Sequence, residues 1–448
     1  MMNKKIVIIG SGPAGLVCAL SCCENGIEPS DILIIERDSE IGGTLNQCIH
    51  SGFGKSYLDE AVTGTELASV LSDGIRQMEI EYITDSTVLS VDKHKRIRIV
   101  SPKYGYCTIK AEAIVLAMGC REKTKGALQI GGTRPAGVFS AGAVQRIVNI
   151  KGYMPGKRTV VLGSGDLAMI VARRLVIEGG SVVCVCEPKE YVEGSDENEQ
   201  ECLKDFGIPL YCSHTVSKIY GKDRVEAVEI SHVDKRGRII KGTSKKIKCD
   251  SFVYQCGLIP ENEIIKETGI RIDTRTKGAY VNQYFETNVK GIFTCGNAVR
   301  IHDLVDYIFE ESLIVAESVK RYLDDKTREP KSVVKIRNGE RILYSVPQHL
   351  DIYDEGIENS VIYFRVNGRY KNLLITVKSG DEIIYSREKG SMSWLETGQI
   401  VIDGALAEKI ENAKNIIICA SEKRDGNDTN DNGQDNQRNV HPVARKDR

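Results

Sequence analysis

The chain has 448 residues and a formal net charge of -1, with acidic and basic side chains intermixed, which argues against a nucleic-acid partner. No apolar run reaches the roughly 18 residues of a membrane span, and none of the N-terminal sequence resembles a signal peptide. Its 14 cysteines lie mostly inside apolar runs, so we expect reduced thiols and a cytoplasmic protein.

The first predicted element is a strand over residues 6–9 that runs into the glycine-rich loop 10–15 and then a helix. In such a loop the first glycine makes the turn, the second lets the backbone approach a pyrophosphate, and the third packs the helix against the sheet. A second strand ends in a carboxylate that can bond a ribose hydroxyl. The pattern predicts a dinucleotide site formed by Gly10, Gly12, Pro13, Ala14, Gly15, Glu36 and Arg37.

The same pattern recurs about 150 residues later, after a strand over residues 159–162. Ala168 takes the place of the third glycine, which a small residue can do. The predicted second site consists of Gly163, Gly165, Asp166 and Glu187. A 2′-phosphate would meet the Glu187 carboxylate, so NADH is favoured over NADPH. The alternative is a pair of ordinary tight turns with surface glutamates; two true sites would indicate electron transfer between two dinucleotides.

Four further segments, 42–44, 114–119, 256–262 and 291–297, match a known pattern. With both loops, they make the chain resemble the FAD-dependent pyridine nucleotide-disulfide oxidoreductases, which include thioredoxin and glutathione reductases, over roughly residues 4–325. The resemblance implies an α/β fold with two Rossmann-like domains, the NAD domain being inserted in the FAD domain. It also implies further cofactor contacts from Gly43, Thr44, Ala117, Gly119, Gly257, Gly296 and Asn297.

More narrowly, residues 45–50, 117–122 and 302–307 are similar to a subgroup that lacks the redox disulfide. That subgroup includes flavoprotein subunits of opine and hydroxyproline dehydrogenases and proteins associated with glycerol-3-phosphate dehydrogenase. The chain has no Cys-x-x-Cys, and of the family's Cys-x4-Cys it retains only the second cysteine, Cys48. Asn297 stands where the family usually has an aspartate that bonds the flavin ribityl chain.

Two residues are candidates for a catalytic role. Cys48 could pair with the flavin as a thiolate of lowered pKa, and the alternative is an ordinary buried thiol. His302 could donate a hydrogen bond at the flavin pyrimidine edge, where relatives point a helix N-terminus, and the alternative is a structural role. Asp303 is predicted to cap that helix, with Leu304 on its apolar face. His50 is expected to be a hydrogen-bonded histidine beside a turn.

Cysteine and histidine spacings predict no metal site, and Cys184 and Cys186 are expected on one side of a buried sheet. Short strands at 362–366, 373–377 and 383–386 indicate a small β-rich domain that serves dimerisation or partner docking. The predicted organisation is FAD domain 1–121 and 259–328, NAD(P) domain 122–258, β-rich domain 332–420 and disordered tail 421–448.

The predicted function is hydride transfer between a nicotinamide nucleotide and FAD, with electrons exchanged with an external acceptor or a second dehydrogenase subunit. Two alternatives remain open. The second loop could be vestigial, so that a partner's substrate reduces the FAD, as in opine or glycerol-3-phosphate type dehydrogenases. Cys48 could instead be the redox centre of a small-disulfide reductase.

Overall fold

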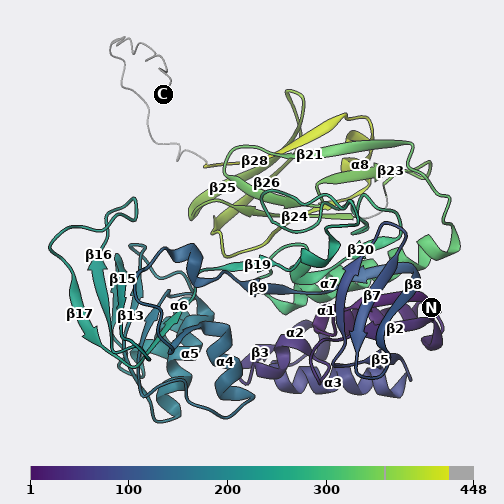
Figure 1. The fold of residues 1–448 in the computed structure, drawn as a ribbon. Helices are drawn as coiled ribbons and strands as arrows, with labels where there is room; N and C mark the ends of the chain where they lie inside the picture. Colours follow the sequence, from purple (N-terminus) through teal and green to yellow (C-terminus); the bar gives the residue numbers. More distant parts are fainter. Residues whose placement is uncertain (1, 358–359, 423–448) are drawn as a thin grey trace, which may run out of the picture.

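The computed structural model describes residues 2–357 and 360–422. Its first domain contains a seven-stranded sheet in the order β5-β2-β1-β8-β7-β6, with β20 also paired to β8 (Figure 1). Strand β1 lies between β2 and β8 and is parallel to both, which makes it the strand where the chain order reverses. The strands are β1 (Met2–Ile9), β2 (Ile32–Ile35), β5 (Glu81–Ile83), β6 (Thr87–Val91), β7 (Arg96–Ser101), β8 (Gly105–Leu116) and β20 (Ile292–Thr294).

Three longer helices, α1 (Pro13–Glu24), α3 (Gly64–Gln77) and α7 (Val305–Asp324), complete this domain, and α1 packs against α7. The second half of β1 (residues 6–9) and all of β2 are apolar and buried because both faces of the sheet are covered there. Between the longer elements lie η1 (Pro29–Asp31), η2 (Gly43–Gln47), β3 (Ser51–Phe53), α2 (Lys55–Leu58), β4 (Val62–Thr63), η5 (Glu263–Ile265) and η6 (Gly296–Ala298).

The second domain is inserted between β8 and β20, and the chain enters and leaves it through the antiparallel pair β9 (Cys120–Glu122) and β19 (Leu258–Pro260) (Figure 1). Its main sheet is fully parallel, in the order β11-β18-β12-β13-β14, and a smaller sheet has the order β10-β15-β16-β17. The predicted pair of Rossmann-like domains is confirmed. The elements are β10 (Gly131–Gly132), β11 (Val138–Ser140), β12 (Arg158–Leu162), β13 (Ser181–Glu187), β14 (Leu210–Cys212), β15 (His214–Tyr220), β16 (Ala227–His232), β17 (Lys245–Lys248), β18 (Ser251–Tyr254), η3 (Lys125–Leu128), α4 (Ala141–Asn149), α5 (Asp166–Ile177), α6 (Asp196–Asn198) and η4 (Glu199–Lys204).

Side-chain alternation along β13 places Cys184 and Cys186 in one apolar cluster, with their sulfur atoms 3.9 Å apart. The prediction that both thiols face one side of a buried sheet is therefore confirmed. All 14 cysteines lie in the described part of the chain, and each is a free thiol there.

The C-terminal domain is β-rich, as predicted, and lies over the first domain (Figure 1). It has a five-stranded sheet, β23-β21-β28-β25-β26, and a three-stranded sheet, β22-β24-β27. Tyr344, Val346 and Tyr363 extend from it into the core of the first domain, so the two domains share a core. The elements are β21 (Ser332–Asn338), β22 (Ile342–Val346), β23 (His349–Ile352), β24 (Ser360–Val366), β25 (Tyr370–Ser379), β26 (Glu382–Met392), β27 (Gly398–Ile402), α8 (Gly404–Glu411) and β28 (Asn415–Glu422).

The tail predicted to be disordered lies, beyond Glu422, outside the described residues. Among the helices of residues 2–357 and 360–422, none combines the length and the apolar character that crossing a membrane would require.

Candidate functional site

The first glycine loop leaves the carboxyl end of β1. Gly10 has φ +102°, which favours glycine, and a Cβ there would lie 2.4 Å from the carbonyl oxygen of Ala117. A Cβ on Gly15 would lie 2.0 Å from the carbonyl oxygen of Gly10, so only hydrogen fits between loop and helix. At Gly12, by contrast, a Cβ would meet no atom within 4 Å. The backbone of Gly12 therefore faces open space at the N-terminus of α1, where an anion can bind.

Other predicted residues pack directly on this loop. A Cβ on Gly43 would lie 2.7 Å from the Cα of Gly12, and one on Gly296 would lie 2.8 Å from the Cβ of Ala14. Pro13 occupies the start of α1, where its fixed φ suits a helix. Segments far apart in the sequence thus meet at one loop. Of the other residues predicted for this site, Thr44 lies in η2, Arg37 is exposed, and Gly119 has φ +68°.

A buried carboxylate ties each glycine loop to the following strand. Glu36 accepts hydrogen bonds at Oε2 from the backbone N–H (2.9 Å) and the hydroxyl (2.6 Å) of Ser11. Glu187 accepts the same pair from Ser164, at 2.9 and 2.8 Å. The other oxygen of each carboxylate accepts the backbone N–H two residues further on. Sequence reasoning missed the two serines, although both loops carry the same Gly-Ser-Gly tripeptide.

The second loop repeats this geometry but is covered at its helix end. Gly163 has φ +103° and donates its N–H to the carbonyl of Cys186 in β13. In the first loop, Gly10 likewise donates its N–H to the carbonyl of Ile35 in β2. A Cβ on Gly165 would lie 2.7 Å from Oε1 of Gln255, and this oxygen accepts a hydrogen bond from the backbone N–H of Ala168 at 3.2 Å. The Gln255 amide therefore occupies the space that is open at Gly12 in the first loop.

Asp166, predicted to bind the cofactor, fastens the segment that follows β13. Its Oδ1 accepts hydrogen bonds from the N–H (2.8 Å) and hydroxyl (3.0 Å) of Ser195 and from Nδ2 of Asn198 (2.7 Å). Gly257 lies beside the link between the domains, where its carbonyl accepts a hydrogen bond from the N–H of Lys123.

The carboxylate of Glu187, described above, is opposed by burial, which raises its pKa, although its hydrogen bonds favour the charged form.

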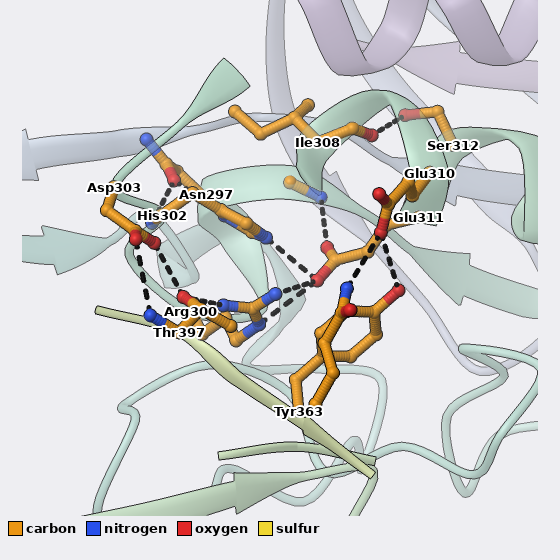
Figure 2. Close-up of polar contacts among 12 residues, drawn as sticks. Asn297, Arg300, His302, Asp303, Ile308, Glu310, Glu311, Ser312, Tyr363 and Thr397 are labelled. Carbon is orange, nitrogen blue, oxygen red and sulfur yellow. Dashed lines mark hydrogen bonds and ion pairs between the residues drawn. The ribbon is translucent and has the colours of Figure 1, made fainter. Parts of the chain in front are cut away.

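A buried chain of polar contacts starts at Asn297 (Figure 2). Its Oδ1 accepts a hydrogen bond from the backbone N–H of His302 and lies 2.9 Å from the ring Nδ1. The ring Nε2 lies 2.8 Å from Oε1 of Glu311, which also accepts a hydrogen bond from Nε of Arg300 at 3.0 Å. The other Glu311 oxygen accepts the N–H of Gly296 at 3.2 Å. Both ring nitrogens of His302 are thus engaged within the protein.

The carboxylate of Glu311 is the anionic centre of this chain, and its side chain and that of Arg300 are both 0% exposed. Burial opposes its charge, but His302 and Arg300 hold the pKa of Glu311 below its usual value. Burial and the nearby Arg300 lower the pKa of His302. The histidine therefore contacts Asn297 on one side and Glu311 on the other, and Glu311 in turn bonds the N–H of Gly296 at the start of η6. Donating to a flavin would require breaking one of the two His302 contacts.

Arg300 and Asp303 connect this buried chain to the C-terminal domain (Figure 2). Nη1 of Arg300 donates to Oγ1 of Thr397 at 3.3 Å, and its guanidinium lies 4.6 Å over the ring of Tyr363. Asp303 accepts a hydrogen bond from the backbone N–H of Thr397 at 3.2 Å and one from Arg365 at 2.9 Å. Sequence reasoning missed Arg300, Glu311 and Thr397, because the partners of Arg300 lie 11 and 97 residues away in the chain.

Two expectations for the start of α7 were wrong. The cap position belongs to Leu304, without a side-chain hydrogen bond, because the Asp303 carboxylate is used by the C-terminal domain. Leu304 was expected on the apolar face, yet it is 52% exposed, whereas Ile308, Val315 and Val319 are buried.

Cys48 is buried, and burial raises its pKa to about 11, despite a hydrogen bond from Gln145. His50 was expected to be hydrogen-bonded, but within the described residues its Nδ1 has no partner; the ring packs 5.1 Å from Phe53. It lines a cavity of about 110 Å³ between the two domains, together with Gln145 and Arg174. In residues 2–357 and 360–422 no group of three or more His, Cys, Asp or Glu side chains could hold a metal ion.

Two Rossmann-like domains, one inserted in the other, each carry a glycine loop at the carboxyl end of a central strand. This arrangement is typical of oxidoreductases that bind two dinucleotides. The open backbone at Gly12, the small residues around it and the positive end of α1 fit the pyrophosphate of FAD.

The chain belongs to the pyridine nucleotide-disulphide oxidoreductase family, whose model matches residues 4–314. It is therefore an FAD-dependent pyridine nucleotide oxidoreductase, and the family implies FAD and a nicotinamide nucleotide as cofactors. The family match ends within α7, so the C-terminal domain lies outside it.

Among curated proteins, the small chain of glutamate synthase [NADPH] from Halomonas elongata is 26% identical over 350 residues, which cover 72% of this chain and 68% of the relative. NADH oxidase of Methanocaldococcus jannaschii is 26% identical over 314 residues, covering 67% of this chain and 64% of the relative. Thioredoxin reductase of T. acidophilum has a similar fold, with a TM-score of 0.58 at 21% identity, over 73% of this chain and 100% of that one.

Proposed function

We propose that this enzyme transfers hydride between NADH and FAD and exchanges the electrons with a partner protein. One observation carries the proposal: a single chain holds two glycine loops with the same serine–carboxylate bonding, each at the carboxyl end of a central strand. Such a pair supports two dinucleotides held in fixed positions, and FAD when bound supplies the hydride chemistry.

In the first site, Gly10, Gly12 and Gly15 would hold the FAD pyrophosphate at the N-terminus of α1, and the Glu36 carboxylate would face the ribose. Asn297 would face the flavin side, held in orientation by His302 and, through Glu311, by Arg300. No protein acid or base is needed for hydride transfer itself, so the role of these residues is to orient the flavin and exclude water.

In the second site, Gly163, Gly165 and Glu187 would hold the nicotinamide nucleotide. The Glu187 side chain is 2% exposed and accepts two hydrogen bonds from Ser164, so its carboxylate has a fixed orientation and would face the ribose 2′ position of a bound nucleotide. Lys189, two residues after Glu187, is paired with Glu193. A 2′-phosphate would meet uncompensated negative charge, which favours NADH over NADPH.

The electron acceptor is proposed to be a second protein, because the chain has no Cys-x-x-Cys and because Cys48, the one cysteine it retains from the family's Cys-x4-Cys, is not a thiol of low pKa. The sequence lacks the dithiol pattern, and burial raises the pKa of Cys48 to about 11. The Halomonas relative is itself named as a small chain, which supports a subunit role.

Anaerobic addition of NADH to the flavin-loaded protein tests the proposal. We expect loss of the flavin absorbance near 450 nm within one turnover and a much weaker response to NADPH at the same concentration. A flavin that stays oxidised in excess NADH contradicts the proposal.

A second candidate is an FAD subunit whose flavin is reduced by a partner's substrate, with no use of the second site. The observation that favours it is the Gln255 amide lying over the second loop. It predicts that neither NADH nor ADP-ribose binds in a calorimetric titration of the flavin-loaded protein, and measurable binding removes it.

A further inference from the structure

The segment 393–397 of the C-terminal domain touches both dinucleotide regions at once. At one end, Trp394 lies 5.0 Å, ring centroid to ring centroid, from Tyr191 of the second domain. At the other end, Thr397 accepts the hydrogen bond from Arg300 and bonds Asp303 beside the first site. Thr397, three residues after Trp394, is therefore anchored to the buried chain of Figure 2.

Tyr191 belongs to the segment that follows Glu187, the carboxylate placed for a ribose. The far end of this segment is tied to the second glycine loop: Glu193 and Gly194 donate their N–H groups to the hydroxyl and carbonyl of Ser164, both at 2.9 Å. Ligands of open α/β sheets bind outside the carboxyl ends of the strands. Tyr191 therefore lies on the adenosine side of the second site.

The indole has aromatic surface and cations around it. Tyr191 is 41% exposed, and Trp394 is half-buried. Nζ of Lys189 lies 5.2 Å and the guanidinium of Arg369 lies 5.9 Å from the indole centre. A purine can stack on such aromatic rings, and the two cations lie at cation–π distance from the indole.

We propose that Trp394 of the C-terminal domain, together with Tyr191, forms the adenosine end of the nicotinamide nucleotide site. The inference rests on the proposed function, because it takes the second loop to be the nucleotide site. It gives the C-terminal domain, which lies outside the family match, a role in binding substrate. The purine ring of an adenine nucleotide is the chemistry that these side chains recognise.

The sequence offers a direct optical test, because Trp394 is the only tryptophan in the chain. ADP-ribose carries the adenosine half and no nicotinamide, so it cannot reduce the flavin. Titrating the flavin-loaded full chain with ADP-ribose is expected to change the tryptophan emission in a saturable way. An emission that stays constant while calorimetry records binding overturns the proposal.

Affinity gives the second measurement. We expect Trp394→Ala to raise the Kd for ADP-ribose about tenfold, within the range for base–aromatic stacking, and Trp394→Phe to retain most of the affinity. The rate at which reduced nicotinamide mononucleotide bleaches the flavin should not change in either variant, because that molecule has no adenosine. An unchanged Kd in Trp394→Ala, or an equal loss with both nucleotides, overturns the proposal.

Tyr191→Ala is the variant to use if the tryptophan variant does not fold, since its side chain is exposed and lies in the other domain. It should raise the Kd for ADP-ribose in the same direction, and an unchanged Kd counts against the proposal. The outcomes are distinguishable from failure of the proposed function: ADP-ribose binding at Trp394 without flavin reduction by NADH removes the hydride transfer and leaves the adenosine site.

Discussion

The first and second glycine loops are built alike up to the helix N-terminus and differ in what lies over it. Each begins with a glycine at φ near +100°, and each has a serine bonded by a buried carboxylate. Over Gly12 there is open space, whereas over Gly165 lies the Gln255 amide, which already accepts an N–H of the helix.

This difference separates a preformed site from one that must open. At the first loop a pyrophosphate can approach the backbone without displacing a side chain, so little reorganisation opposes binding. At the second loop a nucleotide that bound in the same way would have to replace the hydrogen bond between Gln255 and the N–H of Ala168. We infer that the first site is suited to a resident cofactor and the second to a nucleotide that exchanges in each turnover.

The largest predicted effect comes from matched substitutions in the two loops. Gly12→Val fills the open space with a side chain that meets no protein atom near Cβ, so the chain should fold but lose its flavin. We expect the Kd for FAD to rise at least about 100-fold, roughly 2.7 kcal/mol, measured by absorbance and calorimetry.

Gly165→Val is the counterpart in the second loop. It should leave the flavin content unchanged and abolish reduction by NADH. If Gly165→Val loses flavin as Gly12→Val does, the assignment of one dinucleotide to each loop is wrong.

The second-largest effect is expected at the buried ion pair of Arg300 and Glu311 behind the first site. Among residues 2–357 and 360–422, the second loop has no such pair beside it. Glu311→Gln leaves the Arg300 guanidinium buried without an anion, and breaking such a pair lowers the free energy of unfolding by about 3–5 kcal/mol. Denaturant unfolding measures it. The control is Glu310→Gln on the same helix, whose carboxylate is partly exposed and bonds Tyr363, and we expect less than about 1 kcal/mol there. Equal losses would contradict the role given to Glu311.

Removing the Gln255 amide from the second loop should have a moderate effect, and it should strengthen binding where the preceding substitutions weaken binding or stability. Gln255→Ala frees the Ala168 N–H for the nucleotide. The Kd for NADH should fall by about threefold, because one neutral hydrogen bond contributes roughly 0.7 kcal/mol. Gln255→Glu puts a carboxylate at the same place and should weaken it. Weaker binding in the alanine variant would mean that Gln255 assists the nucleotide.

The smallest effect is expected at Cys48, which belongs to neither loop. With a pKa of about 11, only about one thiol in a thousand is ionised at pH 8. Cys48→Ser should keep the rate of flavin reduction by NADH within about twofold from pH 6 to 8. A large loss of this rate in stopped-flow traces would indicate that Cys48 is a redox centre.

The same shift predicts the pH dependence of stability at Cys48. The folded pKa is raised above the usual value of 9.0, so the stability that the protonated thiol contributes is complete below pH 9 and is lost as pH rises towards 11. Thermal unfolding of wild type and Cys48→Ser across this range measures it, and parallel curves would show that the thiol is not buried.

Sequence reasoning succeeded where chemistry is local. A glycine loop, the strand before it and the carboxylate after the next strand lie within about 30 residues, and the same backbone conformation is required wherever the pattern occurs. The β-rich C-terminal domain was predicted for the same reason, because alternation and turns are local signals. The prediction that Asp303 caps α7 was wrong because its carboxylate bonds Thr397 of the C-terminal domain. A contact between residues so far apart in the chain cannot be predicted from the local sequence.

The amino-acid sequence by itself determined the positions of both glycine loops and the strands and carboxylates around them, since these follow from period and spacing along one segment. The insertion of one Rossmann-like domain in the other was implied by the family resemblance that these motifs carry. Only the tertiary structure decided what surrounds them: the Gln255 cover, the burial of Cys48, and the contacts of Arg300 with Glu311 and Thr397. These depend on side chains that distant segments bring together. Burial and pairing, which set charge and access at a site, are properties of the packed molecule.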